Sequence, residues 1–145
     1  MEDRSFVERN RASTERIRAL AASLSDADMR RPVGAHWTVS IALAHLAFWD
    51  RRVMYVLDKT EQEGALFVPE IDIFVNDLSL PLWLAIPPRE AARIAIEEAE
   101  RLDQRLSAYS PALLEELYAT NPRWVERARH RSEHLDEAEA ALRGG

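Results

Sequence analysis

The sequence predicts an all-α protein, a four-helix bundle with a long crossover between its second and third helices. Glycine and proline are the costliest residues inside helices, and their positions leave four long uninterrupted stretches, at 3–24, 38–60, 88–109 and 122–142. Within these stretches apolar residues recur every three or four positions, which lines one face of a helix. No window shows the alternating pattern of a strand bounded by hairpin turns.

The first two stretches each have the pattern of an amphipathic helix. The first carries a patchy apolar stripe that includes Phe6, Ile17 and Leu20. Thr38 is placed to cap the second, because a threonine hydroxyl accepts a hydrogen bond from an unpaired backbone N–H. The second stretch is the most apolar, and we expect it to be buried around much of its circumference. Its stripe consists of Val39, Ala42, Leu46, Trp49, Val53 and Val56.

The connections and the last two stretches complete the layout. Residues 61–87 are too apolar for a mobile linker, so we expect a partly buried crossover with a short helix near Ile71–Leu80. The third stretch is rich in alanines that allow a neighbouring helix to approach closely. A further helical turn is expected from Ser110 through Leu117. Asn121 followed by Pro122 is typical of an N-cap and first-turn pair, which would start the fourth helix.

Length and composition exclude several function classes. The chain has 145 residues, 47% hydrophobic and 30% charged, which is typical of one soluble domain spanning residues 1–145. A net charge of −6 argues against a nucleic-acid partner, because phosphates require a basic excess. The apolar stretches fall short of the roughly 20 residues of a membrane span, and the charged amino terminus lacks a signal-peptide core. We therefore expect a cytoplasmic protein with no membrane partner. The absence of cysteine excludes disulfides and thiolate metal sites.

Three of the four histidines form a candidate metal site. His45 is the sole polar side chain in the apolar run Ile41–Trp49, and burying an imidazole without a partner costs about 1–3 kcal/mol. His130 and His134 are four residues apart, so their rings project from one helix face and can close on one divalent ion. Three imidazoles from two helices leave open positions for water or substrate. In the alternative interpretation, His45 is a hydrogen-bonded core residue and the pair lies at a polar edge.

Further polar residues near the histidine pair have two interpretations each. Glu126 and Glu137 flank its helix face, where a carboxylate can orient a ring N–H, but we favour solvated carboxylates. His36 fits a loop or rim residue better than a ligand.

The crossover and the tryptophans also leave alternatives open. Asn76 and Asp77 are either helix caps, which we favour, or inward polar groups of a site. The four tryptophans are most simply core anchors, although two of them are expected in loops, where they can wall a pocket. These are Trp37 and Trp83 in the loops, and Trp49 and Trp124.

HWTVSIALAHLAFWD and RHRSEHLDEAEAAL, the two stretches that contain the candidate ligands, resemble stretches of the DinB-like superfamily of metal-dependent four-helix bundles. This superfamily includes mycothiol- and bacillithiol-dependent transferases and mycothiol-dependent maleylpyruvate isomerase. HWTVSIALAHLAFWD, at 36–50, is similar to the stretch that opens the family's second helix. RHRSEHLDEAEAAL, at 129–142, is similar to the family's closing helix with two histidines four apart. The resemblance covers nearly the whole chain, and these two stretches are its specific part.

The resemblance implies metal ligands at His45, His130 and His134, a zinc, nickel or similar divalent ion, and a homodimer formed through helix faces. It also implies an enzyme, a transferase or isomerase in which the ion activates a low-molecular-weight thiol toward a small electrophile. Arg52, on the same helix face as His45, then either meets a carboxylate of such a ligand or is a surface charge. The competing function is a non-catalytic stress-response or binding bundle with a structural metal or none.

Overall fold

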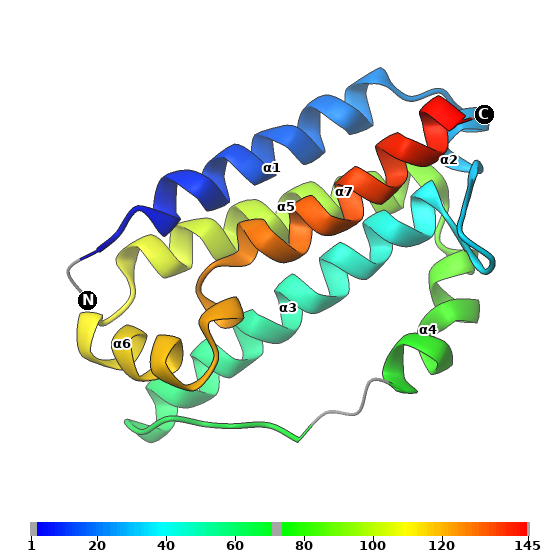
Figure 1. The fold of residues 1–145 in the computed structure, drawn as a ribbon. Coiled ribbons are helices and arrows are strands. Elements are labelled where there is room, and N and C mark those ends of the chain that lie inside the picture. Colours follow the sequence, from blue (N-terminus) through cyan, green and yellow to red (C-terminus); the bar gives the residue numbers. More distant parts are fainter. Residues whose placement is uncertain (1–2, 71–73, 145) are drawn as a thin grey trace.

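Four long helices make up most of the structure, a computed structural model that describes residues 3–70 and 74–144 (Figure 1). The fold class predicted from the sequence, a helical bundle, is confirmed. The long helices are α1 (Phe6–Ser23), α3 (Val39–Glu63), α5 (Pro88–Ala108) and α7 (Arg127–Gly144).

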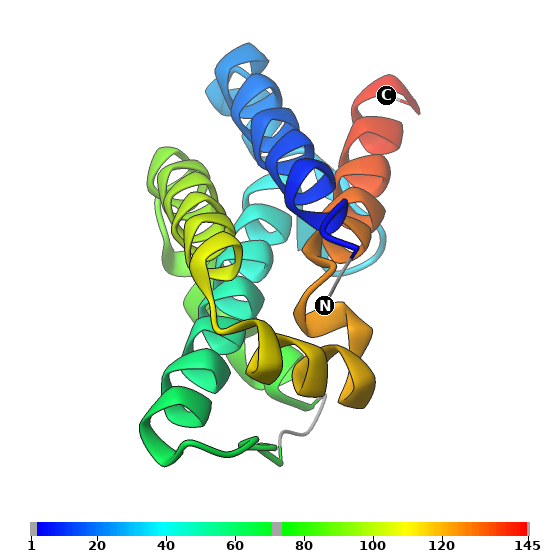
Figure 2. The same ribbon diagram turned by 90° about the vertical axis from the view of Figure 1, so that its left-hand side faces the viewer.

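The four helices close into a ring. Helix α3 packs against α5 and α7, and α1 packs against the same two helices from the other side. Figure 2 shows α1 between α5 and α7 in a view close to the bundle axis. Helices α1 and α7 run in one direction, while α3 and α5 run in the other (Figure 1). Because α3 and α5 are parallel, the chain between them must return along the bundle, which explains the long crossover.

Local signals set both ends of α3. The Thr38 hydroxyl accepts a hydrogen bond from the backbone N–H of Ile41, as expected for an N-cap. The helix ends at Gly64, whose φ of +67° lies in the left-handed region that glycine adopts without steric cost. The structure therefore confirms the predicted start of this helix and extends its end by one turn.

A short helix and a small hairpin join α1 to α3, and neither was predicted. Helix α2 (Asp26–Met29) begins with a capping box formed by Ser25. Strand β1 (Pro32–Val33) then pairs antiparallel with β2 (Trp37–Thr38). Two residues per strand are too few to show an alternating pattern in the sequence, but the hairpin fixes the position of Trp37.

The crossover contains the expected short helix, displaced toward its carboxyl end. Helix α4 spans Phe74–Ala85, whereas residues 71–73 of the expected helix lie outside the described residues. It continues past Pro81, and the buried side chain of Trp83 holds its last turn. Trp83 therefore lies in a helix rather than in a loop. The further helical turn expected at 110–117 is α6 (Pro111–Thr120).

The fourth helix starts later than predicted. Residues Pro122–Trp124 form the 3₁₀-helix η1, capped by the Asn121 side chain, and α7 begins only at Arg127. The side chain of Asn10 on α1 explains the difference. Its amide donates to the carbonyl of Val125 and its carbonyl accepts from the N–H of Ala128. The start of α7 is thus fixed by a residue 118 positions away, which no local pattern reveals.

Two apolar clusters fill the bundle. One lies around Ile17, Leu46 and Leu135 in the half near the hairpin, and the other around Phe6, Leu57 and Leu106 in the half near α6. Among the described residues no helix is long and apolar enough to cross a membrane.

Candidate metal centre

Three histidine rings from two helices meet in the half of the bundle near the hairpin. His45 lies on the buried face of α3, with 3% of its surface exposed. His130 and His134 lie one turn apart on α7, the antiparallel neighbour of α3. The ring centroid of His45 lies 5.1 Å from that of His130 and 4.4 Å from that of His134. The ring centroids of His130 and His134 are 4.8 Å apart. The structure thus brings together the three histidines singled out from the sequence.

The spacing of the ring nitrogens suits one divalent cation. The Nε2 atoms of His45 and His130 are 3.2 Å apart. One ring nitrogen from each of the three histidines lies within 4.8 Å of the others. Two imidazole nitrogens bound at about 2.0–2.1 Å to one ion stand about 2.9–3.4 Å apart at octahedral to tetrahedral angles. Neutral imidazoles are ligands that zinc and nickel accept readily, so the donor set fits such an ion.

Burial keeps two of these imidazoles neutral. Desolvation lowers the pKa of His45 from 6.5 to about 3, and the positive potential of His134 and Arg127 adds to the effect. Burial, followed by the charge of Arg127, also holds the pKa of His130 far below its usual range. A neutral imidazole offers a lone pair, and protons compete only weakly for it. Both rings are therefore ready to bind a cation at neutral pH.

The contacts of the ring nitrogens define their protonation. The Nη2 of Arg127 lies 3.3 Å from Nδ1 of His130, and a guanidinium only donates, so this Nδ1 accepts. The Nε2 of His130 then carries the proton and donates to Nε2 of His45. A cation held by both Nε2 atoms must replace that proton. A neutral His130 ligand would therefore carry its proton on Nδ1, which requires Arg127 to turn away from the ring.

The other two histidines differ in what faces their Nδ1 atoms. Nδ1 of His134 lies 3.3 Å from a carboxylate oxygen of Glu137, the kind of contact that orients a ring and leaves Nε2 free for a cation. Nδ1 of His45 is buried and has no hydrogen-bond partner among the described residues. The Asn76 side chain favours the protonated form of the His45 ring and so opposes a small part of the fall in its pKa.

Three tryptophans surround the histidines. Trp37 of the hairpin lies 4.6 Å from the His45 ring and stacks on His134 at 5.5 Å, measured between ring centroids. Trp83 of α4 presents its ring edge-to-face to His45 at 5.4 Å, and Trp49 of α3 lies 6.1 Å away. These rings remove water from the histidines, which explains the desolvation. Trp37 also lines an open hollow beside His134, so it is a pocket wall, whereas Trp83, 5% exposed, is a core anchor.

A buried network of ion pairs adjoins the histidines of α7. The carboxylate of Asp50 accepts from Nε of Arg127 and from Nε of Arg131, both at 2.9 Å. Arg131 also donates to Asp103 at 2.8 Å. Asp50, Arg127 and Arg131 are 1%, 4% and 0% exposed. Since Arg127 contacts His130 directly, this network fixes the position of that ring relative to α3.

Sequence reasoning missed this network, although the sequence held a signal for it. Asp50 follows the apolar run of α3 and lies on a buried helix. Arg127 and Arg131 repeat the four-residue spacing of the histidine pair, displaced by three positions. A buried acid on one helix and a pair of arginines on another indicate a shared ion pair.

The structure shows the surroundings of the other polar residues considered from the sequence. Glu137 contacts His134 and is not simply solvated, whereas Glu126 pairs with Arg9 of α1. His36 is exposed in the hairpin turn, as expected. Asn76 is an inward polar group rather than a cap, because its carbonyl accepts a hydrogen bond of 2.9 Å from the indole N–H of Trp49.

An open hollow lies beside His134. It has a volume of about 670 Å³ and is lined by the hairpin and by α7, through Val33, Gly34, Trp37, His134, Glu137, Ala140 and Ala141. This hollow gives small molecules access to the histidine cluster from the side of His134.

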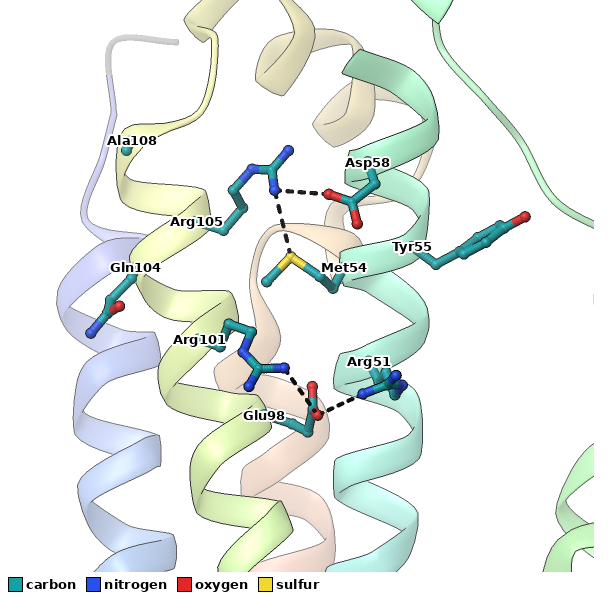
Figure 3. A pocket seen from close by; sticks show the side chains of 9 residues that line it. All are labelled: Arg51, Met54, Tyr55, Asp58, Glu98, Arg101, Gln104, Arg105 and Ala108. Carbon is teal, nitrogen blue, oxygen red and sulfur yellow. Dashed lines mark hydrogen bonds and ion pairs between the residues drawn. The ribbon is translucent and has the colours of Figure 1, made fainter. Parts of the chain in front are cut away.

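A second groove of about 590 Å³ lies between α3 and α5 (Figure 3). Met54 is nine residues from His45, which places it on the opposite face of α3. The arginines of this groove already have carboxylate partners, because Arg51 and Arg101 share Glu98 and Arg105 pairs with Asp58. No histidine lines this groove, so it contains no part of the candidate metal centre.

Comparison with known families agrees with the fold and with the histidine cluster. The family model described as the DinB superfamily matches residues 9–142, nearly the whole chain. Comparison with curated proteins and with solved structures gives no match. The matched range includes all of α3 and the histidine pair of α7. The chain therefore belongs to the DinB superfamily.

Proposed function

We propose that this protein is a metal-dependent enzyme that holds a divalent cation through His45, His130 and His134. The observation that carries the proposal is the convergence of three imidazoles from two helices, with Nε2 atoms of His45 and His130 3.2 Å apart. Two of the rings are kept neutral by burial, and the hollow beside His134 leads to the cluster.

We further propose that the reaction joins a low-molecular-weight thiol to a small electrophile, as a thiol transferase or isomerase. A bound divalent cation supplies a Lewis acid that lowers the pKa of a thiol. The chain contributes no cysteine of its own, so the thiol must come from outside. Trp37 and Trp83 exclude water from the histidines, and Glu137 orients His134. The hollow admits the thiol and its electrophile.

A thiol-conjugation assay tests this function. The protein is purified without chelator or affinity tag, loaded with zinc or nickel, and given N-acetylcysteine with an aryl halide, an epoxide and an activated alkene. We expect thiol loss above the uncatalysed rate that requires the added metal. His45→Asn should abolish it, whereas His36→Asn, which changes an exposed histidine, should retain it. Metal-loaded protein that turns over none of a panel of thiols would contradict the catalytic proposal.

The second candidate is a non-catalytic binding protein. Exposed leucines on α4 favour it, since Leu78 is 75% and Leu82 70% exposed, and apolar side chains on a surface often mark an association site. The homodimer implied by the family resemblance is part of this proposal. Sedimentation distinguishes a species of 16.6 kDa from one of twice that mass. Association together with inactivity toward every thiol would favour this candidate.

A further inference from the structure

Arg52 is a partly buried cation on α3. Among the described residues it takes part in no ion pair with a carboxylate, and its Nε is buried without a hydrogen-bond partner. The arginines around it are paired: Arg51 with Glu98, Arg105 with Asp58, and Arg127 with Asp50. An arginine that is desolvated but unpaired is uncommon, because burial of a charged group normally requires a partner.

Two aromatic rings hold this guanidinium in place. Its central carbon lies 5.4 Å from the ring centroid of Trp49 and 6.0 Å from that of Trp124. Trp124 is 5% exposed, and the indole N–H of Trp49 is anchored on Asn76. Stacking on aromatic faces leaves the N–H groups at the edge of a guanidinium available for a planar anion. Arg52 is therefore preorganised as a donor.

The position of Arg52 relates it to the histidine cluster. It lies seven residues after His45, two helical turns along the same face of α3, which corresponds to a rise of about 10 Å. Trp49 lies between the two residues and contacts both, at 6.1 Å from His45 and 5.4 Å from Arg52. A ligand that reaches from the histidines along this face would meet the guanidinium next.

Arg52 also lines a hollow of its own. This hollow has a volume of about 300 Å³, and the residues that line it with Arg52 are Phe48, Arg51, Tyr55, Pro69 and the exposed Glu70. Phe48, Tyr55 and Pro69 provide an apolar surface for a hydrocarbon body, and Arg51 already has a carboxylate partner in Glu98. A negative group of a ligand would therefore be placed at Arg52, on the side away from the exposed Glu70. Desolvation and the nearby charge of Arg127 lower the pKa of Arg52, and a bound anion would relieve both effects.

We propose that Arg52 binds the carboxylate of a small ligand that spans from the histidine cluster, so that the thiol or the electrophile used by this protein carries a carboxylate at one end. The inference rests on the proposed function for the role of the ligand. A guanidinium forms two parallel hydrogen bonds with a carboxylate, a geometry that an uncharged amide cannot reproduce. Arg52 thereby selects acids over neutral analogues of the same shape.

Matched pairs of ligands test the inference. The probes are 6-mercaptohexanoate and its amide on zinc-loaded protein, and hexanoate and hexanamide on protein without zinc. Calorimetry measures the affinity in every variant. In the unmodified protein, contact with the guanidinium is followed by the nitrogen-15 resonance of the Arg52 Nε–H group, identified by its absence in Arg52→Lys. We expect each acid to shift this resonance and to bind at least about tenfold more tightly than its amide. Arg52→Gln should reduce the preference to below about twofold.

Arg51→Gln provides the matched control, because Arg51 faces the same hollow but already pairs with Glu98. This variant should keep the full preference for the acid. Equal binding of acid and amide by the unmodified protein would overturn the inference, as would an equal loss in both variants. A protein that takes up no zinc but still prefers hexanoate at Arg52 would refute the proposed metal centre and retain the carboxylate site, so the two failures are distinguishable.

Discussion

Asp50 is the residue on which the arrangement behind the histidines depends. It lies on α3, five residues after His45, and its two carboxylate oxygens each accept from a different arginine of α7. Both arginines are buried, so each needs a charged partner to offset its desolvation. One of them, Arg127, in turn contacts His130. A single carboxylate thus couples the two helices that carry the histidines.

Replacing Asp50 by asparagine should therefore destabilise the protein strongly. The Asp50→Asn variant leaves two buried guanidiniums without their shared charge, and breaking a buried pair costs about 3–5 kcal/mol. The free energy of unfolding in urea measures the loss. Asp58→Asn is the control, because the Asp58 side chain is 45% exposed in its pair with Arg105, and an exposed pair contributes at most about 1 kcal/mol. Similar losses in the two variants would show that burial of the network is unimportant.

The lowered pKa values of the histidines predict how stability depends on pH. In the unfolded chain a histidine takes up a proton near pH 6.5, whereas the folded protein holds the pKa of His45 at about 3 and that of His130 also far below normal. Between these values the unfolded state binds more protons, so the protein loses stability as the pH falls. We expect a loss of up to about 1.4 kcal/mol per pH unit for each histidine.

Chemical unfolding at pH 7, 6 and 5 in the presence of a chelator measures this dependence. His45→Gln should flatten the curve, and His36→Gln, which changes an exposed histidine, serves as the control. A stability that rises from pH 7 to pH 5 would contradict the buried, neutral state of the cluster.

At the scale of single residues, the sequence predicted the chemically distinctive side chains better than their surroundings. A lone histidine in an apolar run and two histidines four apart are visible in the sequence, and the structure brings them together. The neighbours of these rings that come from other parts of the fold were not predictable in the same way. Arg127 reaches His130 because Asp50 on another helix holds it, and Asn76 arrives from the crossover. Such contacts depend on tertiary packing, which spacing within one helix does not describe.

Two elements outside the four long helices complete the site. The hairpin places Trp37 against His45 and His134, and α4 places Trp83 against His45. Helix α4 lies beside the first half of α3 (Figure 1). Its exposed leucines contribute little to this attachment, whereas Trp83 is 5% exposed and also packs edge-on against Phe48 at 5.7 Å. Trp83 is therefore the anchor of α4.

Removing this anchor should release α4 while the bundle persists. Trp83→Ala leaves a large cavity, and such substitutions cost about 3–5 kcal/mol when the site cannot collapse. Hydrogen exchange should show lost protection in α4 and retained protection in α1 and α5, because stability is distributed unevenly over cooperative units. Leu82→Ala, at a residue 70% exposed on the same helix, should change protection by an amount equivalent to less than about 0.5 kcal/mol. Retained protection of α4 in Trp83→Ala would contradict the anchoring role.

Elements were predictable in proportion to their length. The long helices α1, α3 and α5 agree with the predicted stretches to within a few residues, because their apolar periodicity extends over many turns. The start of α7 was predicted five residues too early, since Asn10 of α1 supplies the hydrogen bonds that fix it. The hairpin was missed because two-residue strands carry no periodic signal. Its consequence is large all the same, since it brings Trp37 to the cluster.

At the scale of the whole molecule, the bundle topology creates the site. The antiparallel contact between α3 and α7 brings His45 next to residues 85 and 89 positions further along the chain. The sequence predicted four helices but not which of them are neighbours, because periodicity identifies a buried face without naming its partner. The parallel pair α3 and α5, joined through the crossover, leaves α7 free to pack against α1 and the histidine face of α3.

The distribution of charge over the molecule also bears on its ligands. The chain as a whole is acidic, with a net charge of −6. The histidine cluster nevertheless has Arg127 beside it and Arg52 two helical turns away, and burial keeps His45 and His130 neutral. A divalent cation there would create a strongly positive centre inside an acidic protein. Such a centre attracts anionic ligands, which agrees with the proposed thiol and with a carboxylate at Arg52.

The central claim, a metal ion held by three histidines, is tested most directly by metal binding and X-ray absorption on tag-free protein. We predict one equivalent of zinc per chain, with about three imidazole nitrogens at 2.0–2.1 Å. His45→Asn should lose this binding, and His36→Asn should keep it. No zinc uptake by the folded protein, or a bound zinc whose spectrum is unchanged in His45→Asn, would contradict the claim.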